Sequence, residues 1–172
     1  CFYFIYFLFF FFFKQNTAYY IIAVDWSSDV CSSDLYWSKI ANTSAHNSWC
    51  GFSFERICFS HLEQIKRCLG ISGILTRTYA WRSHASKPAA QIDMLIDRED
   101  RVVDVCEMKF ASAEYSITKA ENEKLRNRIE AFRSESGTKK AIHLVMISPY
   151  GIHSNLYSGN VTNQVTMDAL FE

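Results

Sequence analysis

The stretch from Gln91 to Lys109 (QIDMLIDREDRVVDVCEMK) constrains the fold most, because it has the pattern of two β-strands joined by a tight turn. Residues 92–96 and 102–106 are apolar runs rich in strand-forming side chains. The four charged residues 97–100 lie between them and are typical of an exposed hairpin turn. The rest of the sequence is expected to form the scaffold and partner surface around this hairpin.

Side-chain alternation in the hairpin predicts an acidic pair. One face of the first strand should carry Asp93, Leu95 and Asp97, and one face of the second should carry Val103, Val105, Glu107 and Lys109. If Asp97 pairs near Val103, Asp93 falls opposite Glu107. Opposed like charges are destabilising unless a positive group lies between them, so a divalent cation is expected there. Lys109 could then hold a water or a phosphate oxygen beside the metal.

Residues 1–35 do not have the pattern of a folded domain. Residues 1–13 are almost entirely Phe, Tyr, Ile and Leu, as in translated AT-rich DNA, and residues 25–35 (DWSSDVCSSDL) resemble a translated sequencing-library adapter. We interpret residues 1–35 as an artefact outside the domain. The alternative is a membrane anchor or signal segment. However, the apolar run is shorter than the roughly 20 residues of a spanning helix and lacks a basic flank and a cleavage site, so no membrane partner is expected.

Charge and cysteine content point to one ordinary cytoplasmic domain. Without residues 1–35 the chain has 17 basic and 15 acidic residues, a net charge of +2, which argues neither for nor against nucleic acid binding. Four cysteines remain, without a CxxC pair, and they are expected to be reduced core residues: Cys50, Cys58, Cys68 and Cys106. The spacing of Cys58 and His61 could hold zinc, but no second ligand pair accompanies it.

A long helix is expected at the start of the domain, which we place at 51–172 after a polar linker at 36–50. From residue 51 to Gly70, apolar side chains recur every three or four residues. They are Phe54, Ile57, Cys58, Leu62, Ile65 and Leu69. Glu55 lies at the edge of this stripe in the first turn, where the helix dipole alone favours a carboxylate. A functional role for Glu55 requires that the helix pack across the hairpin.

A second helix is expected from Lys119 to about Arg133. Thr118 and Glu121 have the spacing of a capping box, and Gly137 should end the helical region. Its basic side chains are Lys119, Lys124, Arg126, Arg128 and Arg133. Solvation, with pairing to Glu123 and Glu130, is one interpretation of this basic face. Binding of a phosphate backbone is the alternative.

Three further strands complete the predicted sheet. Residues 74–81 are β-branched and aromatic, and a flexible loop at 82–90 connects them to the hairpin. Residues 141–147 (AIHLVMI) are continuously apolar, as in a buried central or parallel strand, with His143 expected to be a core residue. A short strand is expected near 161–165. An exposed apolar tail should follow at 168–171.

The predicted order of helix, three strands, helix and strand resembles the PD-(D/E)XK nuclease-like superfamily. Glu55 on the first helix, Asp93 opening the second strand and Glu107-Met108-Lys109 closing the third carry this resemblance. Strings between Trp49 and Phe171, including WCGFSFERIC, QIDMLIDR and CEMKF, resemble the domain behind the P-loop of prokaryotic, Bacteroides-type AAA-like ATPases. The resemblance implies an α/β (α+β) fold with a restriction-endonuclease-like αβββαβ core and a mixed central sheet flanked by helices.

The same resemblance implies a catalytic site. Its residues would be Glu55, Asp93, Glu107 and Lys109, with Mg²⁺, or Mn²⁺ in its place, held by Asp93 and Glu107. The ion would generate a hydroxide for attack on a DNA phosphodiester while Lys109 stabilises charge. Ile92 replaces the proline of the superfamily's PD dipeptide.

The expected partner is an upstream P-loop ATPase domain that is missing from this chain. No G-x-x-x-x-G-K-[ST] motif is present in it, so no ATP binding or hydrolysis is expected. The alternative to a deoxyribonuclease is a non-catalytic regulatory or partner-docking module of the ATPase, in which the acidic residues are structural.

Overall fold

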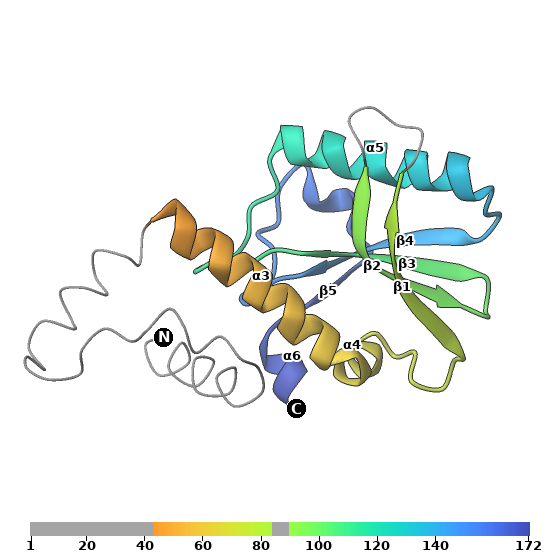
Figure 1. Cartoon of the computed structure of the whole chain (residues 1–172), viewed down its shortest axis with the longest axis horizontal. Helices are drawn as coiled ribbons and strands as arrows, with labels where there is room; N and C mark the ends of the chain where they lie inside the picture. The colour runs from red at the N-terminus through yellow and green to blue at the C-terminus, as the bar shows by residue number, and fades with distance from the viewer. Residues whose placement is uncertain (1–42, 84–89) are drawn as a thin grey trace, which may run out of the picture. The chain divides into compact units, whose positions relative to one another are not determined.

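The computed structural model describes residues 43–83 and 90–172 (Figure 1). All of its helices and strands belong to one compact unit, Ser44–Glu172. The interpretation of residues 1–35 falls outside the described residues. So do most of the predicted linker and the middle of the loop at 82–90.

A five-stranded mixed sheet forms the centre of the domain, with the strands in the order β1-β2-β3-β4-β5. The pairs β1–β2 and β2–β3 are antiparallel, whereas the pairs β3–β4 and β4–β5 are parallel. The strands are β1 (Thr76–Arg82), β2 (Gln91–Arg98), β3 (Val102–Met108), β4 (Ala141–Ile147) and β5 (Asn163–Val165). The parallel placement predicted for residues 141–147 is confirmed.

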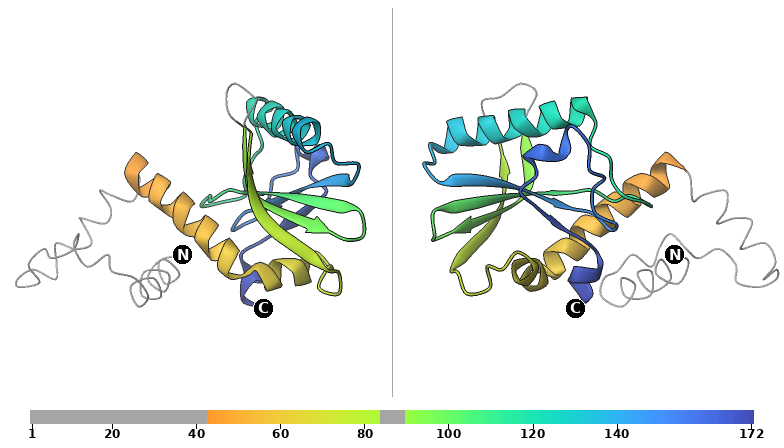
Figure 2. Two further views of the ribbon diagram at one scale, coloured as in Figure 1. Left: turned by 45° about the vertical axis from the view of Figure 1, so that its right-hand side comes forward. Right: turned by 180° about the vertical axis from the view of Figure 1, so that it is seen from behind.

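Helices flank this sheet on both faces (Figure 2). One face is covered by α5 (Lys119–Ser136), and α3 (Ser44–Ser60) and α4 (Leu62–Cys68) lie on the other (Figures 1 and 2). A 3-10 turn η1 (Ser158–Asn160) and a short helix α6 (Asp168–Phe171) belong to the C-terminal segment. The predicted α/β (α+β) class, with a mixed central sheet flanked by helices, is confirmed.

The hairpin of β2 and β3 has the predicted register. Asp97 pairs with Val103, and the ladder ends at the pair Met94–Cys106. Asp93 and Glu107 are therefore the next residues beyond the last pair. The turn is shorter than predicted, because β2 continues to Arg98.

A bulge in β2 corrects the predicted alternation of side chains. Tyr79 of β1 pairs with Leu95, but Trp81 pairs with Ile92, so two residues of β2 stand opposite Ala80. Ile92 consequently joins Leu95 in one buried cluster, although three positions separate them. The side chains from Asp93 to Asp97 therefore do not follow one simple alternation. A bulge changes the direction of the side chains at its position and is common beside functional sites.

The ends of α5 follow the predicted local signals. The backbone nitrogen of Glu121 donates to Thr118 Oγ1 at 3.3 Å, and the Thr118 nitrogen donates to Glu121 Oε2 at 3.0 Å, forming the capping box. Gly137 ends the helix with φ of 62°, a conformation that glycine adopts without strain. The helix extends three residues beyond the predicted end at Arg133.

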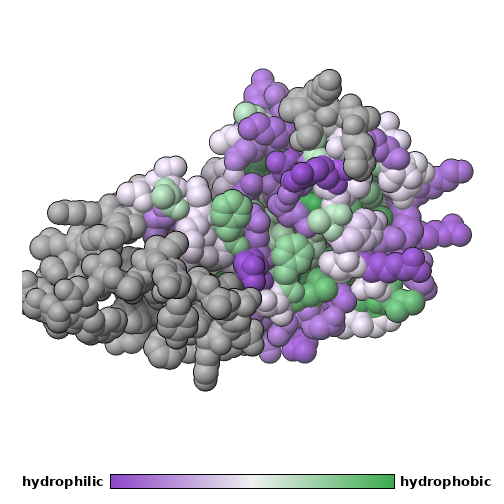
Figure 3. Space-filling model, viewed as in Figure 1, coloured by the Kyte–Doolittle hydropathy of each residue, from purple (hydrophilic) through white to green (hydrophobic). Residues whose placement is uncertain are grey.

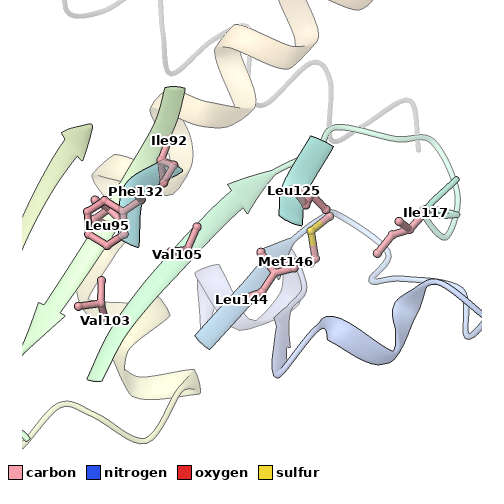
Figure 4. Close-up of a cluster of buried hydrophobic side chains, with 9 residues drawn as sticks. All are labelled: Ile92, Leu95, Val103, Val105, Ile117, Leu125, Phe132, Leu144 and Met146. Atoms are coloured by element: carbon pink, nitrogen blue, oxygen red, sulfur yellow. The ribbon is translucent and has the colours of Figure 1, made fainter. Parts of the chain in front are cut away.

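The main core lies between α5 and the sheet (Figure 4). Leu125 and Phe132 contribute from α5, and Phe132 makes an edge-to-face contact with Trp81 of β1 at a ring distance of 5.4 Å. The strands contribute further apolar residues to this cluster: Ile92, Leu95, Val103, Val105, Leu144 and Met146. This packing holds α5 against the strands that carry the candidate site.

The first helical region begins earlier than predicted and is divided into two helices. The helix α3 begins at Ser44, so residues 44–50 of the predicted linker belong to the domain. Cys50 is buried one turn before Phe54, which extends the apolar stripe. The predicted single helix to Gly70 is also two helices. His61 has φ of −113° and ψ of 32°, which is not helical, and it separates α3 from α4.

The strand predicted at 74–81 instead spans Thr76–Arg82, and the predicted apolar tail is not wholly exposed. Leu170 on α6 is fully buried, whereas Phe171 is half exposed and lies against the His61 ring at 5.0 Å. The tail therefore packs onto the junction of α3 and α4. The short strand predicted near 161–165 is confirmed as β5.

The four described cysteines are all reduced, but they are not all in the core. Cys50, Cys58 and Cys106 are buried, whereas Cys68 is exposed at the end of α4, contrary to the prediction. Burial raises the pKa of the Cys58 thiol to about 12. No helix in the described part of the chain is both long and apolar enough to cross a membrane.

A chain that begins at Tyr36 is expected to melt at about the same temperature as the full chain, because adapter-derived residues carry no selected pattern for packing on the domain. A chain that begins at Gly51 should melt lower, because it lacks the first turns of α3 and the buried Cys50. Calorimetry of the three chains checks both expectations. A large loss of stability in the first truncation would contradict the interpretation of residues 1–35.

Candidate functional site

The candidate site lies at the end of the β2–β3 pair away from the hairpin turn. Because these strands are antiparallel, the end of β3 comes beside the start of β2. Glu107 is the penultimate residue of β3, and Lys109 follows that strand directly. Asp93 is the third residue of β2. Glu55 reaches this region from α3.

Glu107 is a buried carboxylate held by two cations. Its residue is 3% exposed, and its Oε1 lies 2.8 Å from Lys109 Nζ. Arg128 Nη1 donates to both oxygens, at 2.9 Å to Oε1 and 2.7 Å to Oε2. A buried charge requires such compensation because desolvation is costly. The positive charge expected beside Glu107 is thus supplied here by Lys109 and Arg128.

Sequence reasoning missed the contact of Arg128, because solvation and binding of a phosphate backbone were the two interpretations of the basic face that carries it. In the structure it turns towards the sheet and contacts Glu107, 21 residues away. The available signal is its position three residues after Leu125 and four before Phe132, which are both buried. A residue with this spacing borders the apolar stripe of an amphipathic helix.

Asp93 is half-buried in the irregular part of β2, where the bulge lies. Gln91 Nε2 donates to Asp93 Oδ1 at 2.9 Å, and Arg82 Nη2 donates to Gln91 Oε1 at 2.7 Å. Gln91 therefore orients the carboxylate, a contact that sequence reasoning also missed. This hydrogen bond involves Asp93 Oδ1 and not Oδ2.

Glu55 interacts electrostatically with the other three predicted site residues. Burial raises the pKa of Glu55 most, and the Asp93 carboxylate raises it further. The Lys109 ammonium lowers it, and Glu107 contributes another increase. All three neighbours are thus near enough to influence its charge. The helix α3 packs against β3 of the hairpin, which agrees with the condition set for a functional role of Glu55.

The donor chemistry of this site suits Mg²⁺, which prefers carboxylate oxygens and water. Asp93, Glu107 and Glu55 would supply hard oxygen ligands of this kind. However, within residues 43–83 and 90–172 no three His, Cys, Asp or Glu side chains converge closely enough to hold an ion. In addition, both oxygens of Glu107 already contact Arg128. A metal would have to replace that contact.

A second polar cluster occupies the opposite end of β3. Asp104 is 1% exposed, with Arg98 Nη1 at 3.3 Å from Oδ2 and His143 Nδ1 at 3.6 Å from Oδ1. Burial raises the pKa of Asp104, while Arg98 lowers it. His143 is about one-third exposed, so the expectation of a core histidine is corrected: it borders a buried acid at the sheet surface.

The exposed side of α3 carries aromatic residues. Trp49, Phe52 and Phe59 are 43%, 67% and 44% exposed, at spacings of three and seven residues. Such spacing places them along one side of a helix. Figure 3 shows apolar residues scattered among hydrophilic ones on the described part of one face of the molecule.

Comparison with known proteins adds little to this geometry. No protein-family model and no curated protein matches the sequence. Among solved structures there is similarity to a crystal structure described as a protein of unknown function, AF1548, at 13% identity and a TM-score of 0.45. The similarity covers 66% of this chain and 64% of that chain, so it spans less than two thirds of AF1548.

Proposed function

We propose that residues 44–172 form a PD-(D/E)XK nuclease-like domain that hydrolyses DNA phosphodiesters with Mg²⁺. One observation carries this proposal: Lys109 contacts Glu107 at 2.8 Å where the end of β3 lies beside the start of β2, which carries Asp93, and these three residues also act on the pKa of Glu55. Residues far apart in the sequence therefore form a single electrostatic cluster. Its three acids and one lysine are the residue types that metal-assisted phosphodiester hydrolysis uses.

Each residue has a distinct role in this proposal. Asp93 and Glu107 would hold the ion, oriented by Gln91 and by the end of β3 respectively. Bound Mg²⁺ would lower the pKa of a coordinated water and so supply the nucleophile. Lys109 would place its ammonium beside the scissile phosphate to compensate charge. Glu55, whose pKa is raised, would hold or accept a proton more readily than an exposed glutamate at the same pH.

The wider setting of the proposal comes from the sequence resemblance. The domain would be the C-terminal part of a cytoplasmic AAA-like ATPase whose P-loop domain governs cutting. Reduced cysteines in the described residues agree with a cytoplasmic location. ATP itself would bind only to the upstream domain.

The non-catalytic docking module remains the second candidate, and two observations favour it. Glu107 is already neutralised by Lys109 and Arg128, as expected of a structural carboxylate. The side of α3 that carries Trp49, Phe52 and Phe59 would suit a protein partner, because exposed aromatics are typical of interfaces. Metal binding separates the two functions, since only the nuclease requires an ion.

Millimolar Mg²⁺ or Mn²⁺ is expected to raise the melting temperature of the full chain, because an ion that binds only the folded state stabilises it by mass action. The gain should be about 2.7 kcal/mol when the metal concentration is a hundred times Kd. The metal-induced gain should also grow as pH rises above 4.5. Because the pKa of Glu55 is raised, this carboxyl becomes negative, and so attracts a cation, only at a higher pH than an ordinary glutamate does. Differential scanning fluorimetry across pH measures both effects.

Asp93→Ala should abolish the metal-induced gain, whereas Glu123→Ala, at an exposed acid of α5, should retain it. The comparison separates binding at this site from general binding of cations to acidic surfaces. No effect of either cation on the wild-type chain would contradict the nuclease and favour the docking module. Equal loss of the gain in both variants would point to nonspecific binding.

A further inference from the structure

Two exposed phenylalanines of α3 flank a residue of the candidate site. Phe52 and Phe59 are 67% and 44% exposed. Phe52 lies three residues before Glu55 and Phe59 lies four residues after it. Helical residues with these spacings are neighbours on the surface of the helix. The two rings therefore border the part of α3 that contributes to the site.

A third ring lies at the end of β3. Phe110 follows Lys109 directly and is 38% exposed. Its ring lies 6.0 Å from that of Phe54, so the middle of α3 meets the end of β3 that carries the site. The Lys109 side chain is 37% exposed, so its ammonium borders solvent here. The three exposed rings, Phe52, Phe59 and Phe110, are called the aromatic rim below.

Positive charge accompanies the aromatic rim. Arg56 is exposed on the same side of α3, four residues after Phe52 and three before Phe59. In the site itself, Lys109 and Arg128 both contact Glu107, so this buried acid presents no uncompensated charge to a phosphate. Rings with cations beside them suit a nucleic acid, because bases stack on the rings while the cations attract the backbone.

The rings favour a single strand over a duplex. Bases inside a duplex stack on one another, whereas unpaired bases have faces that can stack on a protein ring. Seven residues separate Phe52 from Phe59, which is about 10 Å along the helix axis. This distance corresponds to roughly three nucleotides of a stacked strand. One short strand can therefore reach both rings.

We propose that the aromatic rim binds unpaired bases of single-stranded DNA and brings the adjoining phosphate to Lys109. This inference rests on the proposed function for the kind of nucleic acid. It names the form of the substrate, which is a single strand or an unpaired end in place of an intact duplex. Binding at the rim requires no ion, because stacking and attraction to Arg56 and Lys109 involve only side chains of the chain itself.

The test is binding of fluorescein-labelled DNA to the full chain, measured by fluorescence polarisation in EDTA so that no strand is cut. The probes are an oligothymidylate of about 12 nucleotides and a duplex of the same length. The single strand should bind about tenfold more tightly than the duplex, or more, because each stacked base adds to the affinity. Phe52→Ala should weaken binding of the single strand by about fivefold or more. Phe52→Tyr keeps a ring and should bind like the wild type.

Leu75→Ala is the matched control. Leu75 is 67% exposed, as Phe52 is, but it lies just before β1 at the end of the sheet that carries the hairpin turn. Its affinity for the single strand should equal that of the wild type. Phe59→Ala is a second variant within the aromatic rim and should lose affinity as Phe52→Ala does. All these side chains are largely exposed, so the variants should fold.

The outcomes separate this inference from the proposed function. Equal affinity for single strand and duplex, or unchanged affinity in Phe52→Ala, would overturn the inference, whereas the metal-induced rise in melting temperature tests the nuclease separately. Absence of DNA binding in every chain would also overturn it and leave the aromatic rim to a protein partner. Binding that depends on Phe52, in a chain that neither cuts DNA nor responds to Mg²⁺, would support the inference and overturn the proposed hydrolysis.

Discussion

Replacing Lys109 with alanine is expected to reduce DNA cleavage by about 100-fold or more while metal binding persists. The ammonium is proposed to compensate charge that develops on the phosphate, and loss of one such group costs about 100- to 1,000-fold in rate. Lys109 contacts one oxygen of Glu107, so its loss should leave the carboxylates able to bind an ion. Cleavage of plasmid DNA with Mg²⁺, compared with the metal-induced shift in melting temperature, measures the two properties separately.

The control for this variant is Lys139→Ala. Lys139 is exposed just before β4, which places it at the opposite end of β3 from the site. Its replacement by alanine changes the net charge of the chain by the same amount as the Lys109 variant. Its cleavage rate should stay near that of the wild type. Wild-type cleavage by the Lys109 variant would contradict the assigned role. Loss of cleavage in both variants would instead indicate that overall charge controls DNA binding.

Replacing Phe132 with alanine is expected to lower the free energy of unfolding by about 3–5 kcal/mol, the usual cost of removing a buried phenylalanine. Phe132 is 2% exposed and belongs to the buried cluster in Figure 4. It also joins α5 to the sheet through its ring contact with Trp81. The same helix carries Arg128, so the variant should also weaken the contact with Glu107. Urea denaturation gives the loss of stability.

The matched control is Phe171→Ala, because Phe171 is 53% exposed on α6. Its cost should be well below that of the Phe132 variant, although its contact with His61 makes it more than negligible. Equal losses in the two variants would contradict the assignment of the main core to the space between α5 and the sheet.

Local patterns in the sequence determined much of this fold. The capping box of Thr118 and Glu121 predicts the start of α5, because its hydrogen bonds join residues three apart. The apolar run at 141–147 coincides with β4. The pairing of Asp97 with Val103 follows from a short turn between two apolar strands. Each of these features depends on residues close together in the chain.

The tertiary structure alone decided the environment of the candidate site. The bulge at Asp93 depends on how β1 pairs with β2. Two residues of β2 lie opposite one residue of β1, an arrangement that exists only once the two strands have paired. Arg128 reaches Glu107 only because α5 packs over the sheet, which brings together residues 21 positions apart. The pKa of Glu55 is likewise raised by its burial and by the carboxylates of Asp93 and Glu107, which come from other elements. Local spacing can show that a residue such as Arg128 borders a packed helix face, but the partner that it meets arises from packing between elements and not from the order of residues within one.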